Sequence, residues 1–286
     1  MIQRLCVLGV GLIGGSLALA LKRSGAVGEI VGYERDPLCR AKALSLGIID
    51  RAESGLADAL RGAEVVVLAV PLGAMEGLFQ EMAPLLKPEM VVTDVGSVKD
   101  SVVTAARAAL GARIVDFVPG HPLAGTEKSG PEAAFADLFY LHKVILTPLP
   151  ENRPEAVETV RMMWHRVGAE VVEISSTYHD RVLAGVSHLP HVLAFALMDL
   201  LAKVGEPQDT LQFAAGGFRD FSRIASSDPT VWRDICLANR EPLLALLEQF
   251  EAELHTLGEA LRRGDGGKLV EIFARAKAAR DIHYNA

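Results

Sequence analysis

His121 has the residue type and the setting of a general base. It lies between Gly120 and Pro122 after an expected strand, so we expect a rigid loop at the sheet edge where ligands bind. Imidazole has an ordinary pKa of about 6.5 and can take a proton from an alcohol as hydride leaves. The alternative is a loop histidine that bonds only to the backbone.

A glycine-rich segment near the N-terminus predicts dinucleotide binding. Residues 9–16 read GVGLIGGS and match G-x-G-x-x-G between an expected strand and an expected helix. The three glycines would permit a tight turn, close approach of a pyrophosphate, and helix–strand packing, and the helix N-terminus would face the anion. The alternative is a purely structural glycine turn. The expected cofactor contacts are Gly9, Gly11, Leu12, Ile13, Gly14 and Val70.

The residue after the second strand bears on the choice of cofactor. Glu34 lies twenty residues after Gly14 and can accept hydrogen bonds from the adenosine ribose hydroxyls. A carboxylate there repels a 2′-phosphate, whereas the adjacent Arg35 is either a partner for that phosphate or a solvated surface side chain. We therefore expect NAD, with NADP as the alternative.

A second strand end carries Ser97, within DVGSVK at residues 94–99. Its hydroxyl can bond to a substrate hydroxyl or to the nicotinamide, or it can cap a helix that starts at Val98. Asp94 and Lys99 are interpreted as residues that shape this turn.

Two further segments lie in the second half of the chain. SHLPH at 187–191 interrupts an apolar helix, where His188 and His191 are costly unless they bond to something. They are substrate contacts or satisfied core histidines, and no Cys or acidic residue accompanies them at zinc-like spacing, so we expect no metal. GGFRDFSRIA at 216–225 offers guanidinium groups for a carboxylate. Because Arg219 can pair with Asp220, we favour Arg223, whose unpaired charge would be costly in this segment.

Alternating strand and helix patterns predict that a doubly wound α/β sheet positions these residues. Helices are expected at Gly11–Arg23, from Asp36 with Pro37 at its first position, and at Pro154–Val167. The expected strands are Ile2–Leu8, Glu29–Tyr33, Val65–Val70, Met90–Asp94, Ile114–Phe117, Val144–Thr147 and Glu170–Ile174.

After residue 174 the pattern predicts helices alone. Thr177 and Asp180 suggest a helix start, and Arg181–Val204 is apolar on nearly all sides, as in a bundle core or a subunit interface. Glu241–Arg262 carries an apolar seam that fits either a bundle core or a dimer contact. The seam consists of Leu243, Leu247, Phe250, Leu254, Leu257 and Leu261.

Composition limits the classes of function. The 286 residues predict about two domains, and a net charge of −7 without a basic stripe argues against nucleic acid or an anionic membrane as partner. Cys6, Cys39 and Cys236 are far apart and suggest reduced thiols. We see no apolar run of about 18 residues and no signal peptide, and we expect a cytoplasmic protein.

Together the four segments resemble the prephenate/arogenate (cyclohexadienyl) dehydrogenases of tyrosine biosynthesis. They are GVGLIGGS, DVGSVK, GHPLAGTEKSG at 120–130, and SHLPH followed by GGFRDFSRIASSDPTVWRDI at 216–235. The resemblance covers nearly the whole chain. It implies an N-terminal Rossmann domain, expected over residues 1–174, and an all-helical domain over residues 175–286 that forms a homodimer.

The resemblance also implies a reaction and roles within it. Hydride would leave C4 of the cyclohexadiene ring of prephenate or arogenate for NAD(P)⁺, and the ring carboxylate would leave as CO₂. His121 would deprotonate the C4 hydroxyl beside Ser97, and Arg223 would grip the substrate carboxylate. Matching positions imply further substrate-region residues at Thr126, Glu127, Ser187, His188, His191 and Asp220.

Other questions stay open at this point. With no regulatory domain expected after Ala286, tyrosine inhibition would be competitive within the active site. A 3-hydroxyacid or 6-phosphogluconate-type dehydrogenase and a non-catalytic NAD-binding sensor or scaffold are the alternatives. NADH formation on addition of prephenate separates enzyme from sensor, but the sequence does not separate prephenate from arogenate.

Overall fold

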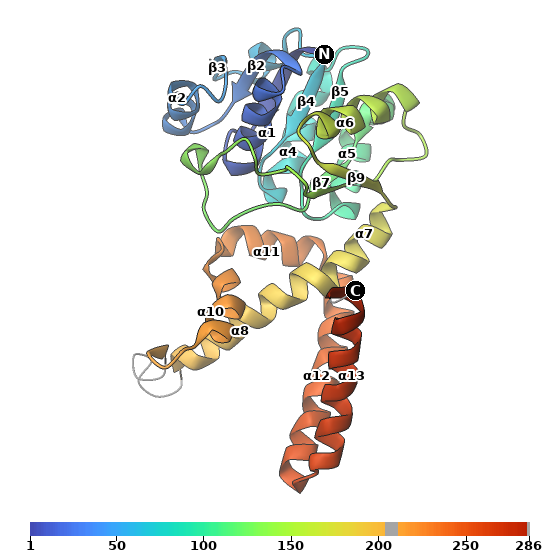
Figure 1. Cartoon of the computed structure of the whole chain (residues 1–286). Helices are drawn as coiled ribbons and strands as arrows, with labels where there is room; N and C mark the ends of the chain where they lie inside the picture. The colour runs from blue at the N-terminus through green and yellow to red at the C-terminus, as the bar shows by residue number, and fades with distance from the viewer. Residues whose placement is uncertain (204–210, 285–286) are drawn as a thin grey trace. The chain divides into compact units, whose positions relative to one another are not determined.

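Strand β1 (Ile2–Leu8) lies in the middle of a six-stranded parallel sheet (Figure 1). The strand order β3-β2-β1-β4-β5-β6 reverses direction between β1 and β4, which opens a crevice for ligands at their carboxyl ends. This computed structural model describes residues 1–203 and 211–284. The expected doubly wound α/β fold is confirmed. The other strands are β2 (Val27–Tyr33), β3 (Arg51–Glu53), β4 (Val65–Leu68), β5 (Val91–Asp94) and β6 (Phe117–Val118).

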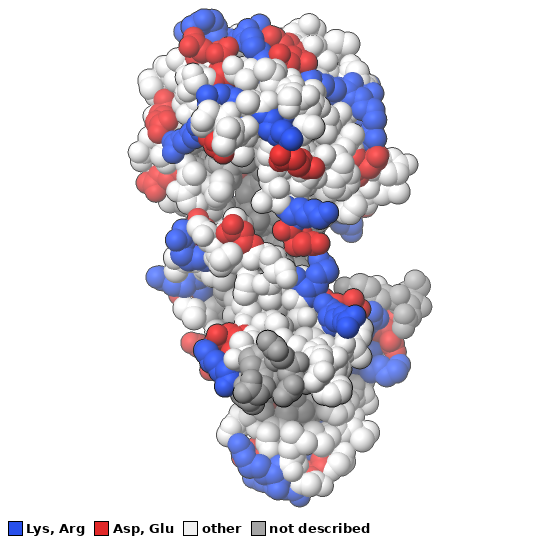
Figure 2. All heavy atoms as spheres, turned by 90° about the vertical axis from the view of Figure 1, so that its left-hand side faces the viewer, with Lys and Arg blue, Asp and Glu red and all other residues white. Residues whose placement is uncertain are grey.

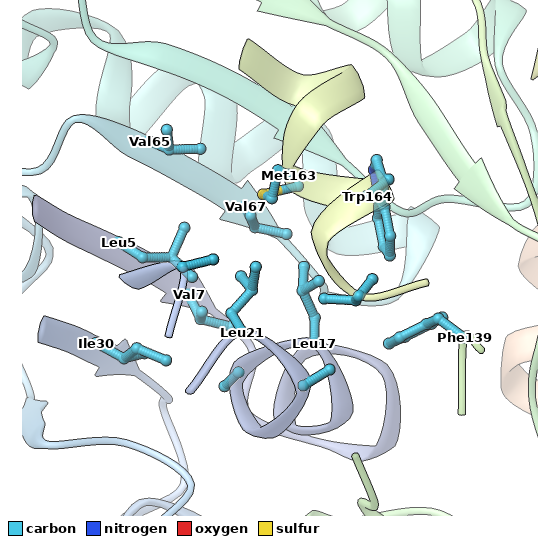
Figure 3. Close-up of a cluster of buried hydrophobic side chains, with 14 of the residues drawn as sticks. Leu5, Val7, Leu17, Leu21, Ile30, Val65, Val67, Phe139, Met163 and Trp164 are labelled. Atoms are coloured by element: carbon cyan, nitrogen blue, oxygen red, sulfur yellow. The ribbon is translucent and has the colours of Figure 1, made fainter. Parts of the chain in front are cut away.

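Helices cover both faces of this sheet because its strands are apolar on both sides. Leu5 and Val7 of β1 belong to one core cluster and Cys6 and Leu8 to the other. Figure 3 shows the first cluster, in which α1 and α6 pack on the strands; α3, α4 and α5 contribute to the second. The helices are α1 (Leu12–Arg23), α2 (Pro37–Ser45), α3 (Leu56–Leu60), α4 (Leu72–Met82), α5 (Asp100–Leu110) and α6 (Pro154–Arg166). Asp36 caps α2 as expected.

A second sheet of three strands corrects the expectation of a single sheet. It consists of β7 (Gly120–Pro122), β8 (Lys143–Leu146) and β9 (Glu170–Glu173), in the order β7-β8-β9. The chain doubles back after β7, so β8 pairs with it antiparallel, and β9 then pairs with β8 in parallel. The strands expected at Val144–Thr147 and Glu170–Ile174 therefore exist, but they do not extend the first sheet.

The strand expected at Ile114–Phe117 is mostly wrong. Residues Gly111–Asp116 form a 3₁₀ helix, and only Phe117 of the expected range lies in β6. The side-chain amide of Asn152 donates to the carbonyl oxygens of Ile114 and Phe117, at 3.2 and 2.8 Å. A side chain from a segment more than thirty residues away in sequence therefore satisfies carbonyl groups that a longer strand would have presented to a neighbour.

Among the described residues from Ser176 to Ala238, helices and helical turns are joined by short turns and no strand occurs. Helix α7 begins after Ser175, whose hydroxyl accepts from the Tyr178 N–H, so the start expected at Thr177 is corrected by two residues. A π-helical turn precedes α8 and accommodates Pro190 in the first turn of α8. The elements are α7 (Ser176–Leu183), the π turn (Ala184–His188), α8 (Leu189–Lys203), α10 (Gly216–Ser222), a 3₁₀ turn (Arg223–Ser226) and α11 (Pro229–Ala238).

The continuous helix Ser176–Lys203 has the length and composition to cross a membrane. The core helices of water-soluble proteins pass the same test, and Ser176–Lys203 contains no uninterrupted apolar run of that length. In α8 only Ala194 is fully buried, and Leu200 is 56% exposed. This helix is therefore less buried within the chain than a helix at the centre of a bundle core would be. Val204, the expected end, lies outside the described residues.

Residues Glu241–Ala286 form a separate compact unit. Its two long helices are α12 (Arg240–Arg263) and α13 (Gly266–Tyr284). Along the apolar seam of α12, Leu243 is buried, whereas Leu254 and Leu261 are 51% and 67% exposed. The seam is therefore only partly covered within this chain.

Candidate active site

His121 is buried in strand β7, which follows β6, the edge strand of the main sheet, in the chain. The side chain sits in a strand paired with Ile145, rather than on the loop we expected, and only 8% of the residue is exposed. Burial lowers its pKa well below 6.5, and the nearby His179 and Lys99 act in the same direction. The imidazole is therefore neutral near pH 7 and able to accept a proton.

A buried ion pair holds the backbone beside His121. The Lys99 ammonium bonds to the Asp94 carboxylate and donates to the Gly120 carbonyl at 2.7 Å. Asp94 also accepts from the Gly96 N–H at 2.7 Å and from the Gly120 N–H at 3.2 Å. Both charged side chains are 0% exposed. Asp94 and Lys99 thus do more than shape a turn, because they tie the end of β5 to the strand that carries His121.

Two residues that the sequence did not single out for chemistry adjoin His121. His179 Nε2 lies 2.8 Å from His121 Nδ1, and His179 Nδ1 lies 2.7 Å from the Asp180 carboxylate. In the sequence, Asp180 was noted only because, together with Thr177, it suggested the start of a helix. Its proximity to His121 depends on α7 packing near the start of α5, which no local pattern reveals.

Ser97 lies in the turn between β5 and α5 and is half-buried. The helix begins at Asp100, not at Val98, so the alternative in which Ser97 caps it is wrong. The start of α5 is instead capped by Asp180, whose two carboxylate oxygens accept from the N–H groups of Lys99 and Asp100, at 2.7 and 2.8 Å. The Ser97 hydroxyl is not needed as a cap.

His188 is buried in the π turn. Its Nδ1 lies 2.9 Å from the Asn239 amide nitrogen, and among the described residues its Nε2 has no hydrogen-bond partner. Burial lowers its pKa to about 4, against an opposing effect of the Asp180 charge and of the Ser97 backbone. The structure thus brings His188 into the neighbourhood of Ser97, as expected for one site.

His191 lies face to face with Trp232. The ring centroids are 3.5 Å apart and the planes meet at 16°, while His191 Nδ1 lies 2.9 Å from the Ser187 carbonyl oxygen. Burial lowers the pKa of His191, and the positive charge of Arg223 lowers it further. Trp232 is therefore part of this region. Ser187 contributes through its backbone, and its side chain is half-buried.

Arg223 forms an ion pair with Glu127, at 3.5 Å. Its side chain is 60% exposed, which corrects the expectation that an unpaired charge here would be costly. Arg219 and Asp220 are exposed as well, and within the described residues they form no ion pair with each other. Thr126 is exposed and its hydroxyl accepts from the Lys128 N–H at 3.2 Å. Arg223, Glu127 and His191 are thus brought together, whereas contacts of Arg219, Asp220 and Thr126 with them are not seen.

The glycine loop has the shape that a dinucleotide requires. Gly9 has φ +94°, and a Cβ there would lie 2.4 Å from the Ala69 carbonyl oxygen; a Cβ on Gly14 would lie 2.1 Å from the Gly9 oxygen. A Cβ on Gly11 would meet nothing within 4 Å, so space is open in front of the N-terminus of α1. Leu12 belongs to the buried core below the loop, and Ile13 packs against that core.

A cavity of about 250 Å³ continues from this loop. Glu34 and Val70 line it, as expected for adenosine and cofactor contacts, and Arg35 lines it while pairing with Glu81 of α4 at 3.1 Å. The residues present fit NAD: an open pyrophosphate cradle, an acid at the ribose position and an apolar wall. Within residues 1–203 and 211–284, no group of three His, Cys, Asp or Glu side chains could hold a metal ion.

Comparison with known proteins agrees with this arrangement. Residues 17–173 match the family described as "Prephenate dehydrogenase, nucleotide-binding domain" and residues 175–275 match "Prephenate dehydrogenase, dimerization domain". A cyclohexadienyl dehydrogenase from Zymomonas mobilis is 38% identical over 97% of this chain and 95% of its own length.

Two solved structures are similar over nearly the whole chain. The prephenate dehydrogenase from A. aeolicus, in complex with hydroxyphenyl propionate and NAD⁺, is 40% identical with a TM-score of 0.91, covering 98% of both chains. The arogenate dehydrogenase of Synechocystis is 29% identical with a TM-score of 0.81, covering 98% of this chain and all of its own.

Fold and site define the class: a Rossmann-type, NAD-dependent oxidoreductase with a helical C-terminal part. The chain belongs to the prephenate dehydrogenase family of tyrosine biosynthesis, whose reaction is an NAD-dependent oxidative decarboxylation. The enzymatic function expected from the sequence is confirmed. The hydroxyacid dehydrogenase and sensor alternatives are set aside.

Proposed function

We propose that this enzyme acts on prephenate, arogenate or both, with His121 as the base that takes the proton of the C4 hydroxyl. The observation that carries the assignment is a buried imidazole, kept neutral by desolvation, in the strand that follows the ligand-binding edge of the sheet. A neutral histidine at that place suits general-base catalysis. The Asp94–Lys99 pair supports it by fixing the adjacent Gly120.

The geometry leaves one ring nitrogen of His121 for the substrate. Nδ1 faces His179, so Nε2 is the atom that accepts the hydroxyl proton. NAD⁺, when bound, accepts the hydride from C4. Aromatisation then favours loss of the ring carboxylate as CO₂, and the proton held by His121 returns to the phenolic oxygen. The chain supplies positioning, one base and charge complementarity, and no covalent nucleophile is required.

Arg223 and His191 are proposed to hold the far end of the substrate. Arg223 is a partly exposed cation paired only loosely with Glu127, at 3.5 Å, so a substrate carboxylate can compete for it. His191, stacked on Trp232, lies within the influence of the Arg223 charge. We assign Ser97 to the hydroxyl and nicotinamide end, and His188, Ser187, Thr126, Glu127 and Asp220 to the surrounding pocket.

The cofactor assignment rests on the loop and the cavity. We propose that Leu12 and Ile13, which follow Gly11, contact the pyrophosphate through their backbone N–H groups, that Val70 lines the cofactor, and that Glu34 accepts from the adenosine ribose. Glu34 favours NAD over NADP. Because Arg35 is engaged by Glu81, it is poorly placed for a 2′-phosphate.

For the assembly we propose a homodimer formed through the helical part, with a domain boundary near residue 174. The match to a dimerization domain and the exposed apolar residues Leu254 and Leu261 support it. We also propose that tyrosine competes in the active site, because aromatisation of the substrate ring gives a product with the phenolic oxygen and side-chain carboxylate that tyrosine carries. A cytoplasmic location is in keeping with its bacterial relatives and with three free cysteines.

The proposal is tested by NADH absorbance with prephenate and with arogenate, each with NAD⁺ and with NADP⁺. We expect NADH formation with at least one substrate, together with CO₂ release, and a higher kcat/KM with NAD⁺. Failure of both substrates to reduce either cofactor would overturn it.

A further inference from the structure

We propose that His179 and Asp180 are positioning residues that fix the tautomer of His121 and stabilise the charge it acquires when it takes the proton. This inference rests on the proposed role of His121 as the base. His179 is 0% exposed and Asp180 2% exposed, so water does not substitute for either contact.

The chain of hydrogen bonds has only one consistent direction when both rings are neutral. A carboxylate can only accept, so the proton between Asp180 and His179 belongs to Nδ1 of His179. The Nε2 of a neutral His179 is then a lone pair, and the 2.8 Å contact requires a proton on Nδ1 of His121. It follows that Nε2 of His121 carries a lone pair. In the other tautomer Nε2 would carry the hydrogen and could not accept the substrate proton.

The same chain places a negative charge behind the base. When the C4 hydroxyl proton moves to Nε2, His121 becomes an imidazolium in a buried setting where desolvation disfavours it. The Lys99 charge also faces His121, but Lys99 is paired with Asp94. Asp180, which His179 links to His121, is the carboxylate at the end of this chain of hydrogen bonds. The proton later returns to the oxygen as the ring aromatises, so His121, His179 and Asp180 end as they began.

Asp180 itself is anchored from three directions. Its carboxylate accepts from the first N–H groups of α5, and its main-chain oxygen accepts from Asn239 at 2.8 Å. These contacts with the chain hold Asp180 in place in this structure. The same contacts make Asp180 a poor residue for a test, because its replacement would also uncap α5. His179 is the better position.

Two variants of His179 separate positioning from packing. In His179→Gln the amide oxygen can take the place of Nε2 and accept from His121 Nδ1, while the link to Asp180 is altered. In His179→Leu the volume is kept and no acceptor remains. We expect His179→Leu to lower kcat roughly 10²-fold or more, because loss of the correct histidine tautomer has effects of at least this size in catalytic triads. The kcat of His179→Gln should be at least tenfold higher than that of His179→Leu. KM and the Kd for NAD⁺ should change less than threefold.

Equal kcat in wild type and His179→Leu would overturn the inference, as would equal losses in both variants. Should the leucine variant not fold, ¹⁵N NMR of the histidine rings in the wild-type enzyme decides. We expect a protonated Nδ1 and an unprotonated Nε2 for His121, assigned by the signal that disappears in His121→Asn. The opposite tautomer would refute the inference. Inactive wild-type enzyme would instead refute the proposed function, so the two failures are distinguishable.

Discussion

The side-chain amide of Asn239 donates to Nδ1 of His188 at 2.9 Å and to the main-chain oxygen of Asp180 at 2.8 Å. Asn239 follows α11, so this one residue joins the last helix of the first unit to the π turn and to α7. Because the amide nitrogen is the donor, His188 Nδ1 accepts and His188 is held as a neutral ring. The lowered pKa of His188 likewise favours the neutral ring.

The neutral His188 should make stability depend on pH. Its pKa falls from 6.5 to about 4 on folding, so the unfolded chain binds more protons between these values. The neutral His188 therefore contributes roughly 3 kcal/mol to the free energy of unfolding, in full above pH 6.5. This contribution is lost as the pH falls toward 4. Urea unfolding at several pH values measures it. We expect a shallower pH dependence in His188→Gln and an unchanged one in His165→Gln, an exposed control. Equal slopes in all three proteins would contradict the assignment.

Replacing His121 by Asn should lower kcat by about 10²–10⁴-fold, the range for loss of a general base. The Kd for NAD⁺ should hardly change, because the glycine loop is untouched. His142→Asn serves as the control, since that ring is exposed. A His121→Asn enzyme with nearly full kcat would remove this residue from the mechanism.

The wild-type enzyme should also retain kcat/KM below pH 6.5. The pKa of His121 is lowered on burial, so protonation of the free enzyme's base sets in only at lower pH. The measurement is kcat/KM from pH 5 upward, with NAD⁺ saturating. An acid limb centred above pH 6.5 would show that desolvation does not control this base.

Cofactor preference should depend on Glu34 and on the partner of Arg35. Glu34→Ser removes the repulsion toward a 2′-phosphate, and we expect a moderate shift of kcat/KM toward NADP⁺. Adding Glu81→Gln frees Arg35 from its ion pair, so the double variant should shift further. Glu81→Gln alone is the control. Preference for NADP⁺ in the wild-type enzyme would refute the role of Glu34.

Arg223→Ala should raise KM for the substrate about 10- to 100-fold, as expected for loss of a charge-assisted hydrogen bond. Because the side chain is 60% exposed, the Tm should stay nearly constant. Arg219→Ala is the matched control on the neighbouring turn. If Arg219→Ala carries the KM defect instead, the two roles are reversed.

Association through α12 should be sensitive to charge on its exposed seam. Leu254→Glu combined with Leu261→Glu should shift the enzyme toward monomer, because exposed leucines of a dimer contact would become charged. Thr256→Glu, an exposed position on the same helix, should leave association unchanged. Sedimentation velocity distinguishes the species. An unchanged dimer in the double variant would place the contact elsewhere.

The face in Figure 2 shows basic and acidic side chains interspersed, without an extended patch of either sign. Surface charge is one property that sequence alone predicts well, because charged side chains are mostly exposed.

The sequence by itself determined strands β1, β2, β4 and β5 of the main sheet, the glycine loop and the order of the functional segments. These depend on local patterns: apolar runs at β1 and β4, G-x-G-x-x-G before α1, and the cap at Asp36. The segment that carries His121 was also recognisable, because it comes after a strand that the apolar pattern predicts. In each case the signal lies within a few neighbouring residues.

Only the tertiary structure decided which side chains meet. Asp180 seemed to belong to its own helix start, yet its carboxylate caps α5, about eighty residues earlier in the chain, and bonds to the ring next to His121. Arg223 was expected in a segment where an unpaired charge would be costly, and it is instead exposed beside Glu127. Such contacts depend on how elements distant in sequence pack, because a side chain's partners and its dielectric surroundings are set by that packing and not by the residues adjacent to it.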